Sequence, residues 1–339
     1  MGLYGGIDLH GNNNVIAIID DKDRVMYQKR LDNDLDIVLT ALGPYRDELV
    51  GLAVESTFNW YWLVDGLMDN DYRVHLANPA AMEQYSGLKY TDDKTDSRWL
   101  AHMLRLGILP EGYIYPKKDR PVRDLLRKRC QLVRYRTSNL LSVNNLITRN
   151  SGSSVKGNVI KKLRDKEIDA TTTDENLALA IKSNLAVIRC LEQQVENIER
   201  VVKKQSRLAP EYKLLLTVDG IGEILAMTIS LETGDIKRFS RVGDFSSYCR
   251  TVSSEHRSNG KKKGKGNPKS GNKYLAWAFI EAATFAIRFN ERARRFYQRK
   301  SAKSKPVVAK KALANKMARA CYYIMRDRVP FDNERLFAT

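Results

Sequence analysis

The first 110 or so positions of the chain alternate short apolar stretches with polar segments. Strand-like patterns cover Leu3–Leu9, Asn14–Asp20, Arg24–Leu31, Gly51–Glu55 and Tyr72–Leu76. Helix-like patterns cover Leu35–Leu49 and Trp60–Asp69. Three strands followed by alternating helices and strands predict a mixed α/β sheet.

This order of elements is typical of a sheet of the ribonuclease H type. From Asp93 onward the pattern becomes helical, beginning with the basic, amphipathic stretch Arg120–Asn150. A small-residue break at Ser151–Gly157 is followed by a second long helix, from about Asp174 to Ser206.

The second long helix carries apolar residues at spacings of three and four, the pattern of a coiled-coil seam. Its apolar residues are Ile181, Leu185, Ile188, Leu191, Val195, Ile198 and Val202. The pattern fits two arrangements equally well, a helix packed within its own domain and pairing between two chains.

A new unit begins after Pro210, where an apolar run leads into Gly220-Ile221-Gly222 and a helix over Glu223–Ser230. This turn resembles a helix-hairpin-helix turn, whose backbone N–H groups bind a DNA phosphate, so we expect Gly220 and Gly222 to contact nucleic acid. A tight turn without a ligand is the alternative. A helix over Tyr274–Phe289 and a helical, basic end complete a mainly α-helical C-terminal domain. We therefore predict an N-terminal domain over 1–115, a basic helix and coiled-coil region over 116–206, and a C-terminal domain over 207–339.

The net charge of the chain indicates what kind of partner the protein binds. The chain has 58 Lys and Arg against 40 Asp and Glu, a formal net charge of +18. A basic surface gains affinity for phosphate by releasing condensed counterions. The positive charge is concentrated in Lys117–Arg136, Lys261–Lys273 and Arg288–Lys311, which favours nucleic-acid binding over a generally basic surface. These blocks do not distinguish RNA from DNA.

The cysteines and the apolar segments indicate a compartment. Cys130, Cys190, Cys249 and Cys321 are far apart, which argues against a structural zinc site and fits reduced thiols. No signal segment opens the sequence, and no stretch approaches the ~20 apolar residues of a membrane span. We expect a cytoplasmic protein with no membrane partner.

Four carboxylates occupy positions suited to metal binding. Asp8 lies inside the first strand, Glu55 ends an apolar strand, and Asp93 and Asp96 lie three residues apart on one face of a helix start. Clustered carboxylates can hold two Mg²⁺ ions about 4 Å apart at a phosphodiester. Asp93 and Asp96 also suit a helix N-terminus without any metal. Asp8 is harder to explain structurally, because strand centres disfavour Asp.

A tract rich in serine, glycine and lysine forms the second candidate site. Ser258 follows His256 and Arg257, and a serine hydroxyl needs a base, a metal or nearby cations to become a nucleophile. Composition alone favours a basic loop that only contacts phosphates. Besides the two glycines, the residues expected to bind nucleic acid are Arg257, Lys261, Lys262, Lys263, Lys265, Lys269 and Lys273.

Taken together, these motifs resemble those of the DEDD-type insertion-sequence transposases, relatives of the Piv DNA invertases, some of which are guided by a bridge RNA. The resemblance covers nearly the whole chain. It is carried by Gly6-Ile7-Asp8, Val54-Glu55-Ser56-Thr57, Asp93-Lys94-Thr95-Asp96-Ser97-Arg98, Val218-Asp219-Gly220-Ile221-Gly222, Ser258-Asn259-Gly260 and Lys269-Ser270-Gly271-Asn272-Lys273-Tyr274-Leu275.

The resemblance implies a RuvC-like N-terminal domain in which Asp8, Glu55, Asp93 and Asp96 bind Mg²⁺. It implies a C-terminal transposase domain with Ser258 as the nucleophile, and strand exchange through a covalent serine–DNA intermediate. Expected partners are donor and target double-stranded DNA, a structured noncoding guide RNA, and further copies of the chain, as dimers that assemble to a tetramer. The resemblance also implies a location in a bacterial cytoplasm or nucleoid. Asp92 competes with Asp93 as third ligand.

The choice of nucleophile and the activity both have alternatives. Ser253, Ser254 and Ser270 compete with Ser258 as the nucleophile. A RuvC-like structure-specific endonuclease would cut DNA without a covalent intermediate. A non-catalytic nucleic-acid-binding protein would show salt-sensitive binding and no metal-dependent chemistry.

Overall fold

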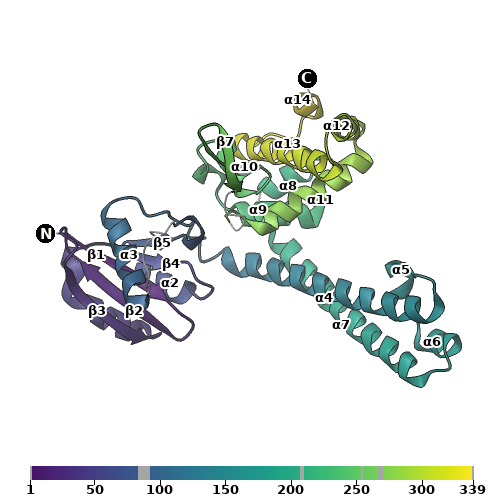
Figure 1. Cartoon of the computed structure of the whole chain (residues 1–339), viewed down its shortest axis with the longest axis horizontal. Helices are drawn as coiled ribbons and strands as arrows, with labels where there is room; N and C mark the ends of the chain where they lie inside the picture. Colours follow the sequence, from purple (N-terminus) through teal and green to yellow (C-terminus); the bar gives the residue numbers. More distant parts are fainter. Residues whose placement is uncertain (1, 83–91, 207–209, 253–254, 266–269, 338–339) are drawn as a thin grey trace. The chain divides into compact units, whose positions relative to one another are not determined.

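The computed structural model of the chain describes residues 2–82, 92–206, 210–252, 255–265 and 270–337. These residues form two compact units (Figure 1). The first unit comprises Met1–Lys117 with Ser254–Ser270, and the second comprises Lys118–Ser253 with Gly271–Thr339. None of the described helices is both long enough and apolar enough to cross a membrane.

The first unit contains the predicted mixed sheet, which has five strands in the order β3-β2-β1-β4-β5. Its strands are β1 (Leu3–Leu9), β2 (Asn13–Ile19), β3 (Val25–Asp32), β4 (Leu49–Glu55) and β5 (Val74–Ala77). β1, β2 and β3 pair antiparallel, whereas β4 pairs parallel with both β1 and β5. This ribonuclease H-like topology confirms the predicted fold class, as does the mainly helical region that follows it.

Helices cover both faces of the sheet. On one face, α1 (Leu35–Leu42) and α2 (Tyr61–Asp69) pack over a core that includes Ile7, Leu52 and Leu63. The predicted helix over Leu35–Leu49 is wrong in its second half, where a 3₁₀ helix covers Gly43–Glu48 and includes Pro44. Proline has no N–H to donate and its ring clashes with the preceding turn, so the α-helix ends at Leu42.

On the other face, α3 (Asp93–Arg105) lies unusually close to β1. A Cβ atom added to Gly6 would lie 2.0 Å from the carbonyl oxygen of Ser97 and 2.6 Å from the amide nitrogen of Ala101. Leu100 and Met103 of α3 also pack on the small residue Ala53 of β4. The absence of a side chain at Gly6 therefore allows the middle of α3, at Ser97–Ala101, to approach the sheet.

The second unit begins with two long helices, α4 (Arg120–Ser151) and α7 (Glu175–Ser206), which pack along each other (Figure 1). The short helices α5 (Gly157–Ile160) and α6 (Asp165–Thr171) connect them. The α7 seam is occupied within the chain, since Ile181, Leu185 and Ile188 form a core with residues of α4, α5 and α6. The described part of the chain therefore supports packing within one domain.

The rest of the second unit is a helical domain built on one large core. Its elements are α8 (Pro210–Leu215), α9 (Glu223–Thr233), the 3₁₀ helix Ile236–Arg238, α10 (Val242–Tyr248), α11 (Lys273–Phe289), α12 (Glu291–Ser301), α13 (Pro306–Asp327) and α14 (Asn333–Phe337). Phe245, Phe279 and Tyr322 are almost fully buried at its centre.

The tract interpreted from composition as a basic loop contains a β-hairpin. β6 (Glu255–Ser258) pairs antiparallel with β7 (Lys261–Lys265). The turn residues Asn259 and Gly260 both have positive φ angles, 49° and 71°. Asn-Gly between two strands is a strong hairpin signal, because both residues adopt positive φ at little cost. The composition-based interpretation missed this signal.

Candidate active site

The register of the sheet brings two acidic side chains together. Ile7 of β1 pairs with Val54 of β4, so the following residues, Asp8 and Glu55, are neighbours on parallel strands. Side chains alternate along a strand, which places Asp8 on the same face as Gly6, the face that α3 covers. Asp8 is only 3% exposed.

The first turn of α3 supplies the other two carboxylates. Asp92 is the N-cap residue, and its carboxylate accepts a hydrogen bond of 2.8 Å from the amide of Thr95. Asp93 and Asp96 follow in the first turn, one helical turn apart. The Asp92 side chain is therefore used in capping the helix, whereas Asp93 and Asp96 are available to the site.

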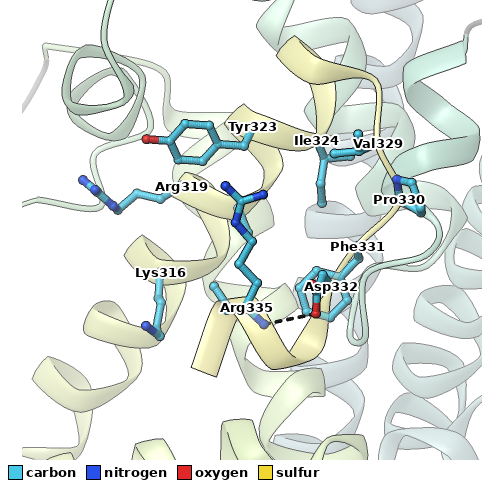
Figure 2. Close-up of a pocket in the computed structure, with 11 residues that line it drawn as sticks. Lys316, Arg319, Tyr323, Ile324, Val329, Pro330, Phe331, Asp332 and Arg335 are labelled. Carbon is cyan, nitrogen blue, oxygen red and sulfur yellow. Dashed lines mark hydrogen bonds between the residues drawn. The ribbon is translucent and has the colours of Figure 1, made fainter. Parts of the chain in front are cut away.

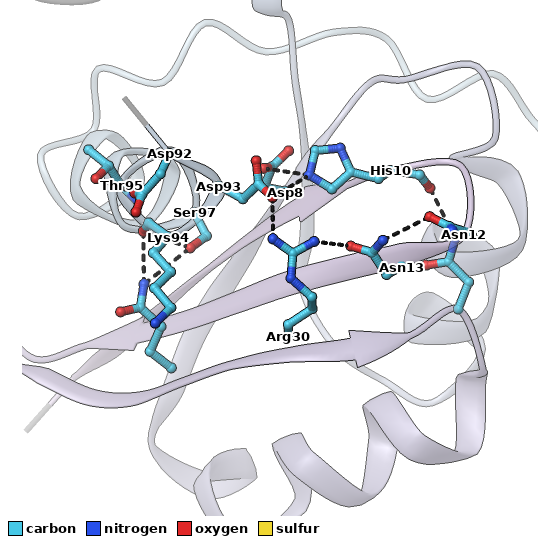
Figure 3. A network of polar contacts seen from close by, with 12 residues as sticks. Asp8, His10, Asn12, Asn13, Arg30, Asp92, Asp93, Lys94, Thr95 and Ser97 are labelled. Carbon is cyan, nitrogen blue, oxygen red and sulfur yellow. Dashed lines mark hydrogen bonds and ion pairs between the residues drawn. The ribbon is translucent and has the colours of Figure 1, made fainter. Parts of the chain in front are cut away.

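The cationic side chain of Arg30, on β3, and the titratable side chain of His10, just after β1, also enter the site (Figure 3). His10 Nε2 lies 3.2 Å from Asp8 Oδ2 and 3.3 Å from Asp93 Oδ2. The guanidinium of Arg30 contacts the carboxylate of Asp93 and donates a hydrogen bond of 2.6 Å to Asn13 Oδ1. Arg30 of β3 is aligned with Asp8 through Val15 of β2, which pairs with both residues.

The carboxylates of this site differ in how readily they ionise. Burial, together with a hydrogen bond and the charge of Asp8, raises the pKa of Glu55 to about 7. Burial and the charges of Asp8 and Asp93 also raise the pKa of Asp96. The hydrogen bond from Arg30 instead lowers the pKa of Asp93. Negative charge is therefore crowded around Asp8, Glu55 and Asp96, whereas Asp93 has a cationic partner.

The donor set fits a divalent cation. One ligand atom from each of Asp8, His10 and Asp93 lies within 4.8 Å of the others. Asp8 Oδ2 and His10 Nε2 are buried and lie 3.2 Å apart, but neither atom makes a hydrogen bond of good geometry in the described part of the chain. An unsatisfied buried carboxylate oxygen is costly unless a cation or donor compensates it, and Mg²⁺ prefers oxygen ligands.

Next to the acids, the surface is hollowed by a cavity of about 240 Å³. Its lining residues are Glu55, Pro79, Met82, Asp96, Trp99 and Leu100. Glu55 and Asp96 therefore border space that solvent or a ligand can enter, and they are the two carboxylates with raised pKa values.

The sequence-predicted acids thus come together in one unit, but two neighbours were not predicted. His10 lies two residues after Asp8, just beyond the end of β1, and continuation of the alternation along the strand places both side chains on one face. That pattern could have identified His10. Arg30 had no such signal, because its place depends on the register of β2 and β3.

The second candidate site is described only in part. Ser258 ends β6, and its side chain lies outside the description, as do those of Arg257, Lys262 and Lys265. Ser253, Ser254 and Lys269 lie outside the described residues altogether. The remaining residues named for this region, Ser270, Lys261, Lys263 and Lys273, are exposed.

The two glycines expected to contact nucleic acid occupy different environments. Gly220 has a φ of +94°, and a Cβ atom there would lie 2.5 Å from the carbonyl oxygen of Ala282. Gly220 therefore has a structural reason to be glycine, the close packing of this turn on α11. Gly222 is exposed at the N-cap of α9 with no atom near its missing Cβ, so its surface is accessible to a ligand.

Comparison with known proteins decides what this acidic site belongs to. A transposase family model for the DEDD domain of IS110 elements matches residues 5–149. A second model, described as "Transposase IS116/IS110/IS902 family", matches residues 212–298. The chain belongs to the IS110 family of transposases. The DEDD match of this IS110 transposase includes all four carboxylates, and the second match includes the hairpin with Ser258.

One curated relative matches most of this IS110 transposase. It is a "Probable family 20 transposase" of Pseudomonas aeruginosa, 23% identical over 288 residues. The match covers 81% of this chain and 83% of the relative. The family assignment makes the protein an enzyme of DNA cleavage and strand transfer, and DNA is therefore among its partners.

Proposed function

We propose that this transposase cuts and rejoins DNA through a covalent bond between Ser258 and a DNA phosphate, with Mg²⁺ held by Asp8, Glu55, Asp93 and Asp96. The observation that carries the proposal is the cluster of carboxylates, in which burial and the neighbouring acid Asp8 raise the pKa of Glu55 to about 7. Like charges at such short range are unfavourable by themselves, and perturbed carboxylates of this kind cluster at functional sites.

In this proposal each acid has a defined place. Asp8 provides its unsatisfied Oδ2 atom, and Glu55 and Asp96 provide carboxylates beside the cavity. Asp93 is preferred over Asp92 as the third ligand, because Asp92 caps α3 while Asp93 faces Asp8 and His10. When bound, Mg²⁺ supplies Lewis-acid stabilisation of the charged oxygens of the phosphodiester. Arg30 orients Asp93 through its ion pair.

The serine step conserves atoms and charge. Ser258 Oγ forms a bond to the scissile phosphorus while the bond between phosphorus and the leaving sugar oxygen breaks. The proton lost from the serine is balanced by the proton that the leaving oxygen takes up. Support for Ser258 comes from the family resemblance of Ser258-Asn259-Gly260 and from its position at the end of β6, beside the Asn259–Gly260 turn.

The guide RNA and the tetramer are further parts of the proposal. Base pairing by a structured RNA would read donor and target sequence, so the protein itself needs only backbone and shape contacts. The net charge of +18 supports binding to more than one nucleic acid. Seam residues such as Leu185 are buried within the chain, so subunit contacts in a tetramer would use other surfaces.

The test is a search for a covalent protein–DNA adduct. Protein, Mg²⁺, RNA from the flank of the element and junction DNA are incubated, and the adduct is resolved on a denaturing gel. We expect an adduct with the wild-type protein, none with Ser258→Ala, and a loss of roughly a thousandfold or more with Asp8→Ala. Ser270→Ala, which removes a rival hydroxyl, is the matched control and is expected to form the adduct. Omission of the RNA is expected to abolish it.

Other outcomes would contradict defined parts of the proposal. Cleaved DNA without an adduct, unaffected by Ser258→Ala, would replace the serine mechanism with a RuvC-like nuclease. An adduct that persists in Ser258→Ala but disappears in Ser270→Ala would move the nucleophile. An adduct of equal yield without RNA would remove the guide from the proposal.

A further inference from the structure

A pocket of about 590 Å³ lies between α13 and the segment that leads into α14, within the second unit (Figure 2). Its volume falls in the range of about 300–1,000 Å³ that is usual for ligand sites. The acidic site belongs to the other unit, so this pocket needs an explanation of its own. Its chemistry separates into a charged side and an apolar side.

The charged side carries three cations and one acid. Lys316 and Arg319 come from α13, Arg335 comes from α14, and Asp332 precedes α14. Asp332 Oδ1 accepts a hydrogen bond of 3.0 Å from the backbone amide of Arg335. Figure 2 shows the Arg335 side chain reaching toward Arg319 and Tyr323. The pocket therefore has an excess of positive charge.

These cations differ from several arginines of the same unit. Arg123, Arg129 and Arg292 each have a carboxylate partner. In the part of the chain that the structure describes, neither Arg319 nor Arg335 forms an ion pair with a carboxylate. Two guanidinium groups that converge on one pocket repel each other, and an anion between them would remove that repulsion.

The other side of the pocket is aromatic and aliphatic. Tyr323 and Phe331 are half-buried in its wall, and the exposed residues Val329 and Pro330 also line it. The guanidinium of Arg326 lies 4.8 Å from the centre of the Tyr323 ring and holds it in place. Nucleobases stack on aromatic rings of this kind, and cations beside them bind the linking phosphates.

We propose that this pocket binds an unpaired nucleotide of the nucleic acid handled by the transposase. Arg319, Arg335 and Lys316 bind its phosphate, and the base lies against Tyr323 and Phe331. The concave shape suits a single base outside a stack better than a duplex, whose bases are paired and covered. The proposal extends the proposed function by naming what the C-terminal unit binds, and it depends on nucleic-acid handling but not on Ser258.

An acidic peptide would also satisfy the cations, but the aromatic wall favours a base. DNA and RNA share the chemistry of a base joined to a phosphate, so the experiment compares the two. Oligonucleotides of about ten nucleotides, within the usual site sizes of single-strand binding, are used as single-stranded DNA, single-stranded RNA and blunt duplex. Binding to the full chain is measured by fluorescence anisotropy over a range of salt concentrations.

Arg319→Ala and Arg335→Ala are each expected to weaken single-strand binding about tenfold and to reduce the logarithmic salt slope by about 0.7. Arg200→Ala is the matched control, because it removes one exposed arginine from α7, away from the pocket, and its effect should stay below about twofold. Tyr323→Leu should weaken binding about fivefold or more, whereas Tyr323→Phe keeps the ring and should bind normally. Cross-linking of a 5-iodouracil oligonucleotide to the peptide containing Tyr323 would locate the base.

Equal losses for Arg319→Ala and Arg200→Ala, with no cross-link at Tyr323, would overturn the proposal. Displacement of the oligonucleotide by polyglutamate, with retained peptide binding and no cross-link, would instead make the pocket a peptide site. Preference for RNA or for DNA in the Arg319-dependent component identifies the source of the nucleotide. Normal oligonucleotide binding by the pocket variants would overturn this inference. If the same variants still form the covalent adduct, the proposed function stays intact.

Discussion

Two carboxylates of this protein are buried to nearly the same extent but have opposite surroundings. Asp8 in the first unit is 3% exposed, and Glu232 in the second unit is 2% exposed. Asp8 is crowded by the acidic residues Glu55 and Asp96, and it also contacts the titratable ring of His10 at 3.2 Å. Glu232 is surrounded by donors. The site around Asp8 therefore needs an added cation, whereas the site around Glu232 already contains the cationic side chains that neutralise it.

Both carboxylate oxygens of Glu232 accept hydrogen bonds from neighbouring side chains. Arg127 donates to both of its carboxylate oxygens, at 2.5 and 2.7 Å, and Arg123 and Asn272 donate at 3.2 and 2.7 Å. Burial opposes the charge, but the hydrogen bond from Arg127 and the charge of Arg123 hold the pKa of Glu232 below its ordinary value. The network ties α4 and α9 to Asn272, the N-cap of α11.

The comparison teaches that burial alone does not identify a catalytic acid. A buried charge that is satisfied by its own chain serves the fold, since loss of either partner leaves an uncompensated charge. A buried charge that is surrounded by like charges destabilises the fold and persists where a function requires it. Three substitutions test this distinction, in decreasing order of expected effect.

Glu232→Gln should lower the free energy of unfolding by about 3–5 kcal/mol, because Arg123 and Arg127 then lose the charged carboxylate that both of them contact. Urea-induced unfolding measures the change. Glu223→Gln is the matched control, since the exposed Glu223 pairs with Lys203 and contributes about 1 kcal/mol or less. Equal effects of the two substitutions would show that the Glu232 network adds nothing beyond a surface pair.

Asp96→Asn should act in the opposite direction and raise the free energy of unfolding by about 0.5–2 kcal/mol in the presence of EDTA, because it removes one of the crowded charges. The same substitution should abolish DNA cleavage. Asp92→Asn serves as the control with little effect on stability, since asparagine caps a helix as well as aspartate does. A loss of stability in Asp96→Asn would mean that its carboxylate is satisfied within the fold, as that of Glu232 is.

The pH dependence of the metal-free protein should reveal Glu55. Its pKa rises from 4.5 to about 7, so its contribution to stability is complete below pH 4.5 and is lost as the pH increases to about 7. Over that range the Tm of the wild-type protein should fall relative to Glu55→Gln by roughly 2–4 °C, with allowance for the partial exposure of the side chain. Mg²⁺ should reduce the difference. Parallel curves for the two proteins would show that Glu55 is not perturbed.

Local patterns in the sequence were sufficient for most of the elements. The strand β1 has the predicted bounds Leu3–Leu9, and α4 ends one residue beyond the predicted Asn150. The errors occur where the backbone preferences of single residues decided the structure and the hydrophobic pattern did not. These residues are Pro44, after the shortened first helix, and Asn259 and Gly260 in the hairpin turn. Both signals were present in the sequence, and each has a local backbone cause.

Charge was harder to interpret than periodicity. The block Lys117–Arg136 was expected to bind nucleic acid. Arg120 and Arg123 of this block are nevertheless buried, with only 4% and 7% of their surface exposed. Arg136 also pairs with Glu192. Part of this block therefore stabilises the fold. No pattern in the sequence distinguishes an arginine that binds phosphate from one that binds a distant carboxylate.

The sequence by itself determined most strands and helices of the first unit and the family resemblance, because these depend on local patterns along the chain, and it predicted the residues of the acidic set. The tertiary structure decided which charges meet. His10 and Arg30 join Asp93 only through strand register and the close approach of α3 at Gly6. The pocket at Arg319 and Arg335 likewise exists only because α14 lies beside α13. Electrostatic interactions depend on distance in space, and a linear pattern does not contain that distance.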